Sequence, residues 1–156
     1  MIVYFDTSAL IPLLVAEPTS AGCRRLWEDA DAIVSTRLLY VEAGTALAQA
    51  RRLDRLDAEQ HRRCLELLDQ LWPQFNVVEL DAALCSSAAR LAHDHALRGY
   101  DAVHCAAALD LVGEDLVAAT GDQQLLAAWH AEGLATFDTR QPSPPAEAAP
   151  RRDGSP

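Results

Sequence analysis

Short apolar runs alternate with helical patterns along most of the chain, and this alternation limits the possible folds more than any other feature. The first run, residues 2–6, is rich in β-branched and aromatic side chains and ends at Asp6, as a buried strand of a parallel sheet would. Further strands are expected at residues 32–35, 75–80, 116–119 and 134–137. Strands that alternate with helices indicate an α/β fold, in which helices cover both faces of a parallel sheet.

Helices are expected between these strands, from capping residues and from apolar residues at helical spacing. Thr7 or Ser8 is expected near the cap of the first helix, with Pro12 in about its first turn, and Gly99 is expected to end the helix that Asp81 caps. The expected helical ranges are 7–15, a segment that begins at Thr19 or Ser20, 38–54, 57–71, 81–97, 100–111 and 122–130. The helix at 38–54 is expected to bury the stripe Leu39, Ala43, Ala46, Leu47, Ala50 and Leu53.

The length of 156 residues suits one domain with a substantial core. We expect this domain at residues 1–138 and a disordered tail at 139–156, where five of the eight prolines occur and large apolar residues are almost absent. No apolar run approaches the roughly 18 residues that span a bilayer, and the N-terminus resembles a strand more than a signal peptide. The sequence therefore predicts a cytoplasmic protein without a membrane partner.

Charge and composition narrow the classes of function. The formal net charge of −10 argues against a protein that grips nucleic acid through a broad basic surface, and it favours a metal-dependent site or a basic partner. All 13 basic side chains are arginine, so mechanisms that need a catalytic lysine are excluded. Phosphatases and receiver domains that carry an aspartate at the end of the first strand normally need that lysine. The four cysteines lack a C-x-x-C arrangement and are expected to be reduced thiols, mostly buried.

Acidic residues are expected near the carboxyl ends of the strands, where open α/β sheets bind ligands. Asp6 closes the first strand, Asp122 follows the fourth, Asp101 begins a helix, and Glu42 lies one turn into the helix after the second strand. Converging carboxylates repel one another, and Mg²⁺ or Mn²⁺ would remove the repulsion and support phosphodiester hydrolysis. Each acid taken alone is more often a helix cap or a solvated side chain, so the residues alone leave the reaction open.

Four segments in order resemble the PIN domain, and in particular the VapC-type toxins of type II toxin–antitoxin pairs. These segments are VYFDTSAL at 3–10, YVEAGTAL at 40–47, LRGYDAVHCAAA at 97–108 and VAATGDQQLLAA at 117–128. The resemblance covers about residues 1–137. It implies a three-layer α/β/α sandwich with a five-stranded parallel sheet.

The resemblance also implies an activity and its partners. It implies a Mg²⁺- or Mn²⁺-dependent endoribonuclease that acts on structured RNA such as tRNA or ribosomal RNA, a homodimer, and a VapB-type antitoxin whose C-terminal segment fills the active-site groove. Asp6, Glu42, Asp101 and Asp122 match the acidic quartet of the family, and Thr7 and Thr120 match positions with a hydroxyl beside the acids. Asp6 and Asp101 would bind the metal directly or through water. Glu42 and Asp122 would complete the outer shell or bind a second ion.

Two other functions stay open from the sequence. One is a housekeeping PIN nuclease of RNA processing that has no antitoxin, and the other is a non-catalytic binding module with the same fold. His104 follows Asp101 by three residues and could approach the site, although an ordinary helix histidine is the simpler expectation. The basic cluster Arg51, Arg52, Arg55, Arg62 and Arg63 is expected to form helix-pair salt bridges, with an RNA or antitoxin contact as the alternative.

Overall fold

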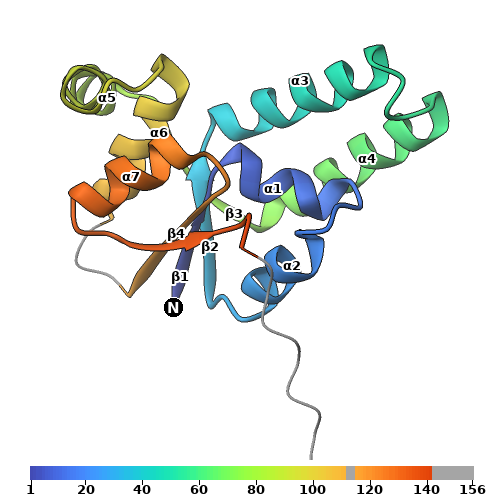
Figure 1. The fold of residues 1–156 in the computed structure, drawn as a ribbon, viewed down its shortest axis with the longest axis horizontal. Helices are drawn as coiled ribbons and strands as arrows, with labels where there is room; N and C mark the ends of the chain where they lie inside the picture. Colours follow the sequence, from blue (N-terminus) through green and yellow to red (C-terminus); the bar gives the residue numbers. More distant parts are fainter. Residues whose placement is uncertain (112–114, 142–156) are drawn as a thin grey trace, which may run out of the picture.

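A computed structural model describes residues 1–111 and 115–141 of the chain. Within these residues, strands and helices alternate as the apolar pattern predicts (Figure 1). The strands are β1 (Ile2–Phe5), β2 (Ala32–Thr36), β3 (Phe75–Val78), β4 (Leu116–Thr120) and β5 (Ala135–Asp138). The helices are α1 (Thr7–Leu14), α2 (Ser20–Glu28), α3 (Leu38–Arg52), α4 (Ala58–Leu71), the short 3₁₀ helix η1 (Trp72–Gln74), α5 (Ala82–His95), α6 (Gly99–Leu109) and α7 (Gln123–Ala131).

The described strands form one parallel five-stranded sheet in the order β3-β2-β1-β4-β5. The order reverses at β1, because the chain first adds strands on the β2 side and then continues on the β4 side. In the register of β1 and β4, Phe5 lies opposite Ala119, so Asp6 and Thr120 follow at the same edge of the sheet. This confirms the expected α/β fold and brings the ends of the first and fourth strands together at the switch point.

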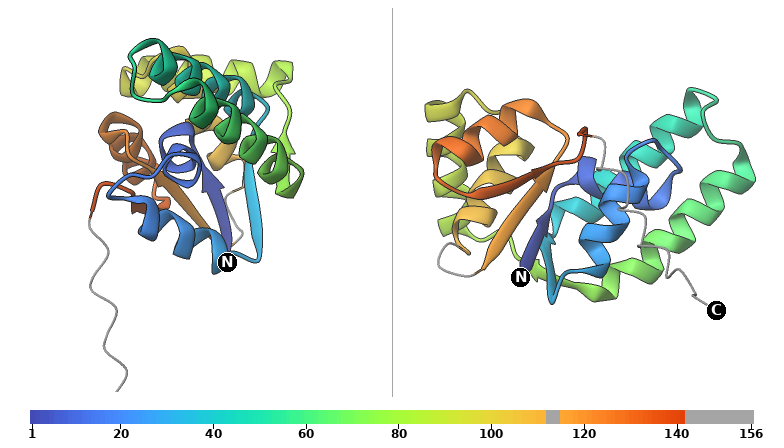
Figure 2. Two further views of the ribbon diagram at one scale, coloured as in Figure 1. Left: turned by 90° about the vertical axis from the view of Figure 1, so that its right-hand side faces the viewer. Right: turned by 60° about the horizontal axis from the view of Figure 1, so that its bottom comes forward.

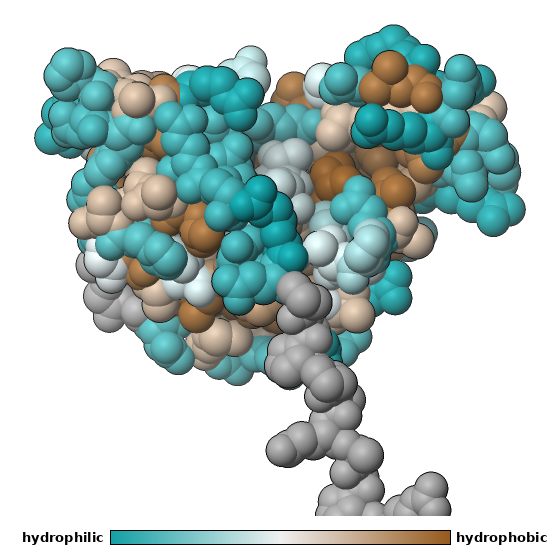
Figure 3. Space-filling model, in the orientation of Figure 1, coloured by the Kyte–Doolittle hydropathy of each residue, from teal (hydrophilic) through white to brown (hydrophobic). Residues whose placement is uncertain are grey.

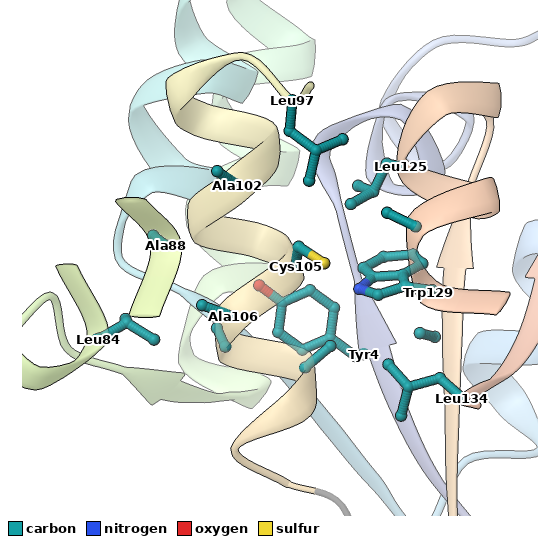
Figure 4. Packing of buried hydrophobic residues seen from close by; sticks show 14 of the residues in the cluster. Tyr4, Leu84, Ala88, Leu97, Ala102, Cys105, Ala106, Leu125, Trp129 and Leu134 are labelled. Carbon is teal, nitrogen blue, oxygen red and sulfur yellow. The ribbon is translucent and has the colours of Figure 1, made fainter. Parts of the chain in front are cut away.

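Each face of the sheet carries a separate hydrophobic core, because successive side chains of a strand point to opposite faces. Val3 and Phe5 of β1 pack with α1 to α4, while Tyr4 packs with α5, α6 and α7. Figure 2 shows these two helix layers on either side of the sheet. Figure 4 shows the second core, where the Tyr4 ring lies between α6 and Trp129 of α7.

Several details differ from the sequence predictions. Asp6 itself caps α1 by accepting a hydrogen bond from the Ala9 N–H at 2.9 Å, in place of Thr7 or Ser8, and Pro12 lies in the second half of α1 rather than its first turn. Leu53 was expected in the buried stripe of α3, but it lies just beyond the helix end and is 55% exposed.

The C-terminal end of α5 also differs from the sequence prediction. Gly99 was expected to end this helix, but it begins α6, and Ala96 ends α5 with a left-handed φ of 54°. A hydrogen bond from the Leu97 N–H to the Ala92 carbonyl closes that turn. An alanine therefore takes the left-handed position that glycine most often occupies at the end of a helix.

The described residues contain no helix that is long and apolar enough to cross a membrane. Cys23, Cys64 and Cys105 are buried, Cys85 is exposed, and all four thiols are free, as expected. The expected tail at 139–156 falls mainly on residues 142–156, outside the described residues. Thr139 belongs structurally to the sheet edge, because it is buried and its N–H donates to the Thr120 carbonyl.

Candidate active site

Asp6 is held at the carboxyl end of β1 by hydroxyl and backbone donors. Oδ1 accepts hydrogen bonds from Ser8 Oγ at 2.7 Å and from the Ala9 N–H, and Oδ2 accepts one from Thr120 Oγ1 at 2.6 Å. Burial raises the pKa of the Asp6 carboxyl, although the electrostatic influence of the nearby His104 ring and these hydrogen bonds act in the opposite direction. A buried carboxylate with a raised pKa is a group that a nearby cation would stabilise.

The segment after β4 approaches Asp6 closely because it contains Gly121. The Gly121 N–H donates to Ser8 Oγ, and the Asp122 N–H donates to Thr120 Oγ1 at 2.9 Å. A Cβ at position 121 would lie 2.8 Å from Thr139 Oγ1 and 3.3 Å from Ser8 Oγ. Glycine is therefore the residue that fits this crossing, and Ser8 and Thr120 join the strand ends on both sides of the switch point.

Glu42 reaches the same place from the first turns of α3. Its Oε2 accepts hydrogen bonds from Thr7 Oγ1 at 2.9 Å and from His104 Nε2 at 2.7 Å. Burial acts to raise the pKa of Glu42, but the hydrogen bonds from His104 and Thr7 outweigh it and the pKa is lowered. Glu42 is therefore ionised at neutral pH.

Arg98 connects the remaining two acids. Its Nε donates to Asp101 Oδ2 at 3.1 Å, and its terminal nitrogen lies 3.6 Å from Asp122 Oδ2. Asp122 also caps α7 by accepting hydrogen bonds from the N–H groups of Gln124 and Leu125. The Arg98 side chain is 78% exposed, so the two acids are bridged by a cation that water and other ligands can reach.

All four acids line one pocket with a volume of about 410 Å³, together with Arg98, His104 and Thr7. The donor set consists of carboxylate oxygens, which suits Mg²⁺ or Mn²⁺ better than zinc. In residues 1–111 and 115–141, however, no three Asp, Glu, His or Cys side chains stand close enough to form a ready metal site. The acids fit a hard cation by chemistry, and Arg98 holds Asp101 and Asp122 in the arrangement seen here.

Comparison with known proteins identifies the family. The model of the PIN domain matches residues 3–143. Ribonuclease VapC45 of Mycobacterium tuberculosis is 40% identical over 132 residues, which cover 85% of this chain and 92% of VapC45. The chain belongs to the PIN-domain family.

Solved structures agree with this PIN fold. PAE2754 from Pyrobaculum aerophilum is 27% identical, and the match covers 89% of this chain and 85% of that chain with a TM-score of 0.64. FitAcB from Neisseria gonorrhoeae is 20% identical, covers 89% of this chain and 98% of its own, and has a TM-score of 0.66. Because FitAcB is only 20% identical to this chain, its similarity concerns the fold alone.

The four acids expected from the sequence line one pocket, but several residues that contact them were not expected there. Thr7 and Thr120 contact Glu42 and Asp6 directly, as the expected hydroxyl positions beside the acids. Ser8, Arg98 and His104 also bond to the acids, although none was predicted to do so. The three-residue spacing of His104 and Asp101 is the sequence signal for this contact, although an ordinary helix position is the simpler expectation from it.

The basic cluster mostly forms the salt bridges expected for a solvated helix face. Arg62 pairs with Glu59 at 2.7 Å and with Glu66, and Arg63 pairs with Glu59 at 2.8 Å. Arg51 lies 3.6 Å from Asp54. These pairs neutralise three of the five arginines, and of the remaining two, Arg52 and Arg55, only Arg55 lines the groove formed with α1 and α3.

Proposed function

We propose that this PIN domain is a Mg²⁺- or Mn²⁺-dependent endoribonuclease and the toxin of a toxin–antitoxin pair, acting on structured RNA such as tRNA or ribosomal RNA. The observation that carries the proposal is the single pocket lined by Asp6, Glu42, Asp101 and Asp122 at the switch point of a PIN fold. The 40% identity to a protein named as a ribonuclease supports the choice of RNA.

The acids would hold the metal with Asp6 and Asp101 as direct or water-mediated ligands, and with Glu42 and Asp122 in the outer shell or at a second ion. A bound divalent cation supplies a lowered pKa for its water and compensates charge on the phosphate. Asp6 is preorganised for this role because three donors, the Ser8 and Thr120 hydroxyls and the Ala9 N–H, fix its two oxygens. Arg98 would exchange its contacts with Asp101 and Asp122 for a phosphate oxygen of the RNA. Its guanidinium is exposed at the pocket mouth, where RNA can reach it.

Tyr100 supports an RNA path over this edge of the site. Its side chain is 62% exposed and lines a hollow of about 380 Å³ with Glu42, Arg98 and Asp101. An exposed aromatic ring beside an arginine can stack on a base whatever its identity. The contact needs no broad basic surface, which fits a chain with a net charge of −10.

A groove next to the acidic pocket, lined by apolar residues together with Glu17, Gln49 and Arg55, supports a VapB-type antitoxin as the partner. The groove has a volume of about 300 Å³ and shares Ile11, Glu17 and Ala46 with the acidic pocket. Leu53, which is 55% exposed, also lines this groove. Figure 3 shows hydrophobic side chains in the hollow beside the projecting α3–α4 pair. An apolar peptide segment laid in this groove would reach the acids with its end and block RNA.

The deciding experiment uses the purified full chain without a partner, total cellular RNA, and Mg²⁺ or Mn²⁺. We expect metal-dependent endonucleolytic cleavage that EDTA abolishes, and we expect Asp6→Asn and Asp101→Asn to lose it while their circular dichroism spectra are unchanged. Asp94→Asn is the matched control, because Asp94 is an exposed aspartate of α5 outside the pocket. Undiminished cleavage by either site variant would contradict the assignment.

The same protein also distinguishes a toxin from a housekeeping nuclease and from a non-catalytic binding module. A toxin stops growth when it is expressed alone and is rescued by the product of a short neighbouring gene, whereas a housekeeping nuclease does neither. A non-catalytic module binds RNA without cleaving it in any metal. The expected homodimer stays a prediction that multi-angle light scattering measures on the same preparation.

A further inference from the structure

His104 lies in the interior of the molecule, yet it contacts an acid of the candidate site. Its side chain is 2% exposed, and its Nε2 lies 2.7 Å from Glu42 Oε2. An ionised carboxylate can only accept, so Nε2 carries a proton and donates it to Glu42 in either charge state of the ring. His104 is therefore a donor dedicated to one carboxylate oxygen.

The other ring nitrogen of His104 is tied to the sheet. Nδ1 lies 2.8 Å from the hydroxyl of Tyr4, a fully buried residue of β1. The two rings meet edge to face, with centroids 5.9 Å apart, and Tyr4 meets Trp129 in the same way. Packing in the core thus sets the direction of the imidazole, and through it the position of Glu42.

The contacts to Glu42 gather on one of its two oxygens. Thr7 Oγ1 and His104 Nε2 both donate to Oε2. No hydrogen bond within residues 1–111 and 115–141 reaches Oε1, and Glu42 lines both hollows of the site. Two protein donors therefore fix Oε2 of Glu42, which leaves Oε1 for a ligand in the pocket.

We infer that His104 is a positioning residue that, braced by the Tyr4 hydroxyl, fixes Oε2 of Glu42 and presents Oε1 to a divalent cation or its water. The inference rests on the proposed metal-dependent function. It also explains why α6 supplies two groups to one site: Asp101 acts on the pocket directly, and His104, one turn later, acts through Glu42. Partners that orient metal ligands are typically worth about 10- to 100-fold in metal affinity or activity.

The test compares substitutions that keep or remove the donor. His104→Leu removes it, His104→Gln can return an N–H to Glu42, and Tyr4→Phe removes the brace alone. Mn²⁺ alone is titrated into each metal-free protein by calorimetry, and kcat and KM are measured separately on one RNA substrate. We expect His104→Leu to weaken Mn²⁺ binding about 10-fold and to lower kcat more than KM changes, with Gln recovering most of the loss and Tyr4→Phe losing less than Leu.

A background without the Glu42 carboxylate separates positioning from general stability. In Glu42→Gln, adding His104→Leu is expected to leave Mn²⁺ affinity unchanged. The same fold-loss in both backgrounds, or equal losses for Leu and Gln, would overturn the inference. If His104→Leu does not fold, Tyr4→Phe decides, because it deletes one hydroxyl, and unchanged Mn²⁺ affinity there overturns the inference. His95→Leu controls for the loss of a histidine outside the pocket. Absence of RNA cleavage by the wild type would refute the proposed function while the Mn²⁺ titrations still judge His104.

Discussion

Thr120 Oγ1 donates a 2.6 Å hydrogen bond to Oδ2 of Asp6 and thereby joins the ends of two neighbouring strands. The same hydroxyl accepts the N–H of Asp122 at 2.9 Å. One fully buried hydroxyl thus couples two of the four acids, and it does so at the point where the strand order of the sheet reverses.

Replacing Thr120 by valine keeps the shape and removes this coupling. We expect Thr120→Val to lose about 1–3 kcal/mol of unfolding free energy, because Asp6 and the Asp122 N–H each lose a buried partner. RNA cleavage should fall at the same time, since Oδ2 of Asp6 loses the donor that fixes its direction, while Ser8 and the Ala9 N–H still hold Oδ1. Urea denaturation and initial cleavage rates measure the two effects. Thr120→Ser keeps the hydroxyl, so it should stay near wild type in both, and a serine variant as impaired as the valine variant would disprove the role of the hydroxyl.

Gly121 offers a test of the close crossing between Ser8 and Thr139. Gly121→Ala places a Cβ 2.8 Å from Thr139 Oγ1 and 3.3 Å from Ser8 Oγ, so the Thr139 side chain must shift and Ser8 Oγ must also yield. We expect a loss of about 1–3 kcal/mol in stability from this overpacking and slower RNA cleavage, because Ser8 is displaced from Asp6. Gly44→Ala in α3 is the control, since no atom lies within 4 Å of its Cβ position. That change should stabilise the protein by up to about 1 kcal/mol.

The order of strands and helices could be predicted from the sequence because the spacing of apolar residues within each segment depends only on that segment. Asp6 and Asp122 could be placed together from strand ends alone, since parallel strands align their carboxyl ends and one reversal of order makes two of them neighbours. Glu42 required the family resemblance, because nothing local separates it from other glutamates on helices.

The supporting residues could not be predicted in the same way. His104 meets Glu42 across 62 positions and Tyr4 across 100, so the contact depends on how α3 and α6 dock against the sheet. Leu53 illustrates the converse: its spacing fitted the buried stripe, but α3 ends before it and no second layer covers it. Long-range docking of the helices, rather than local propensity, therefore determines the contacts of His104 and the exposure of Leu53.

The left-handed cap of α5 provides a stabilising substitution. Ala96 has a φ of 54°, a conformation that costs an L-residue about 1–2 kcal/mol and costs glycine little. Ala96→Gly should therefore raise the free energy of unfolding by about 0.5–1 kcal/mol after the larger chain entropy of glycine is subtracted. Urea denaturation measures it. Ala89→Gly, at an exposed position inside α5, should lose about 1 kcal/mol, and a loss at both positions would show that the cap is not strained.

The raised pKa of Asp6 gives a pH-dependent difference between two metal-free proteins. Burial raises this pKa above its ordinary value of 3.8, so the charged side chain destabilises the fold at neutral pH. The destabilisation disappears as the pH falls below the folded and unfolded pKa values. We expect metal-free Asp6→Asn to melt at a higher temperature than wild type at neutral pH, and the gap to close towards about pH 4. Thermal melts in EDTA measure it, and a gap that widens on acidification would reverse the sign we assign.

Arg98 occupies the two carboxylates, Asp101 and Asp122, that the proposed metal would bind, so its effect on metal binding can be measured apart from its proposed contact with RNA. It bridges Asp101 at 3.1 Å and Asp122 at 3.6 Å, so a cation entering the pocket must displace it. Arg98→Gln should therefore tighten Mn²⁺ binding, because no internal cation has to leave, and raise KM for RNA, because a phosphate contact is lost. Calorimetric titration of Mn²⁺ and steady-state cleavage measure the two effects. Arg90→Gln, an exposed arginine of α5 bonded to Ser87, should change neither. Weaker Mn²⁺ binding by Arg98→Gln would instead mean that Arg98 organises the acids for the metal, and the competition we describe would be wrong.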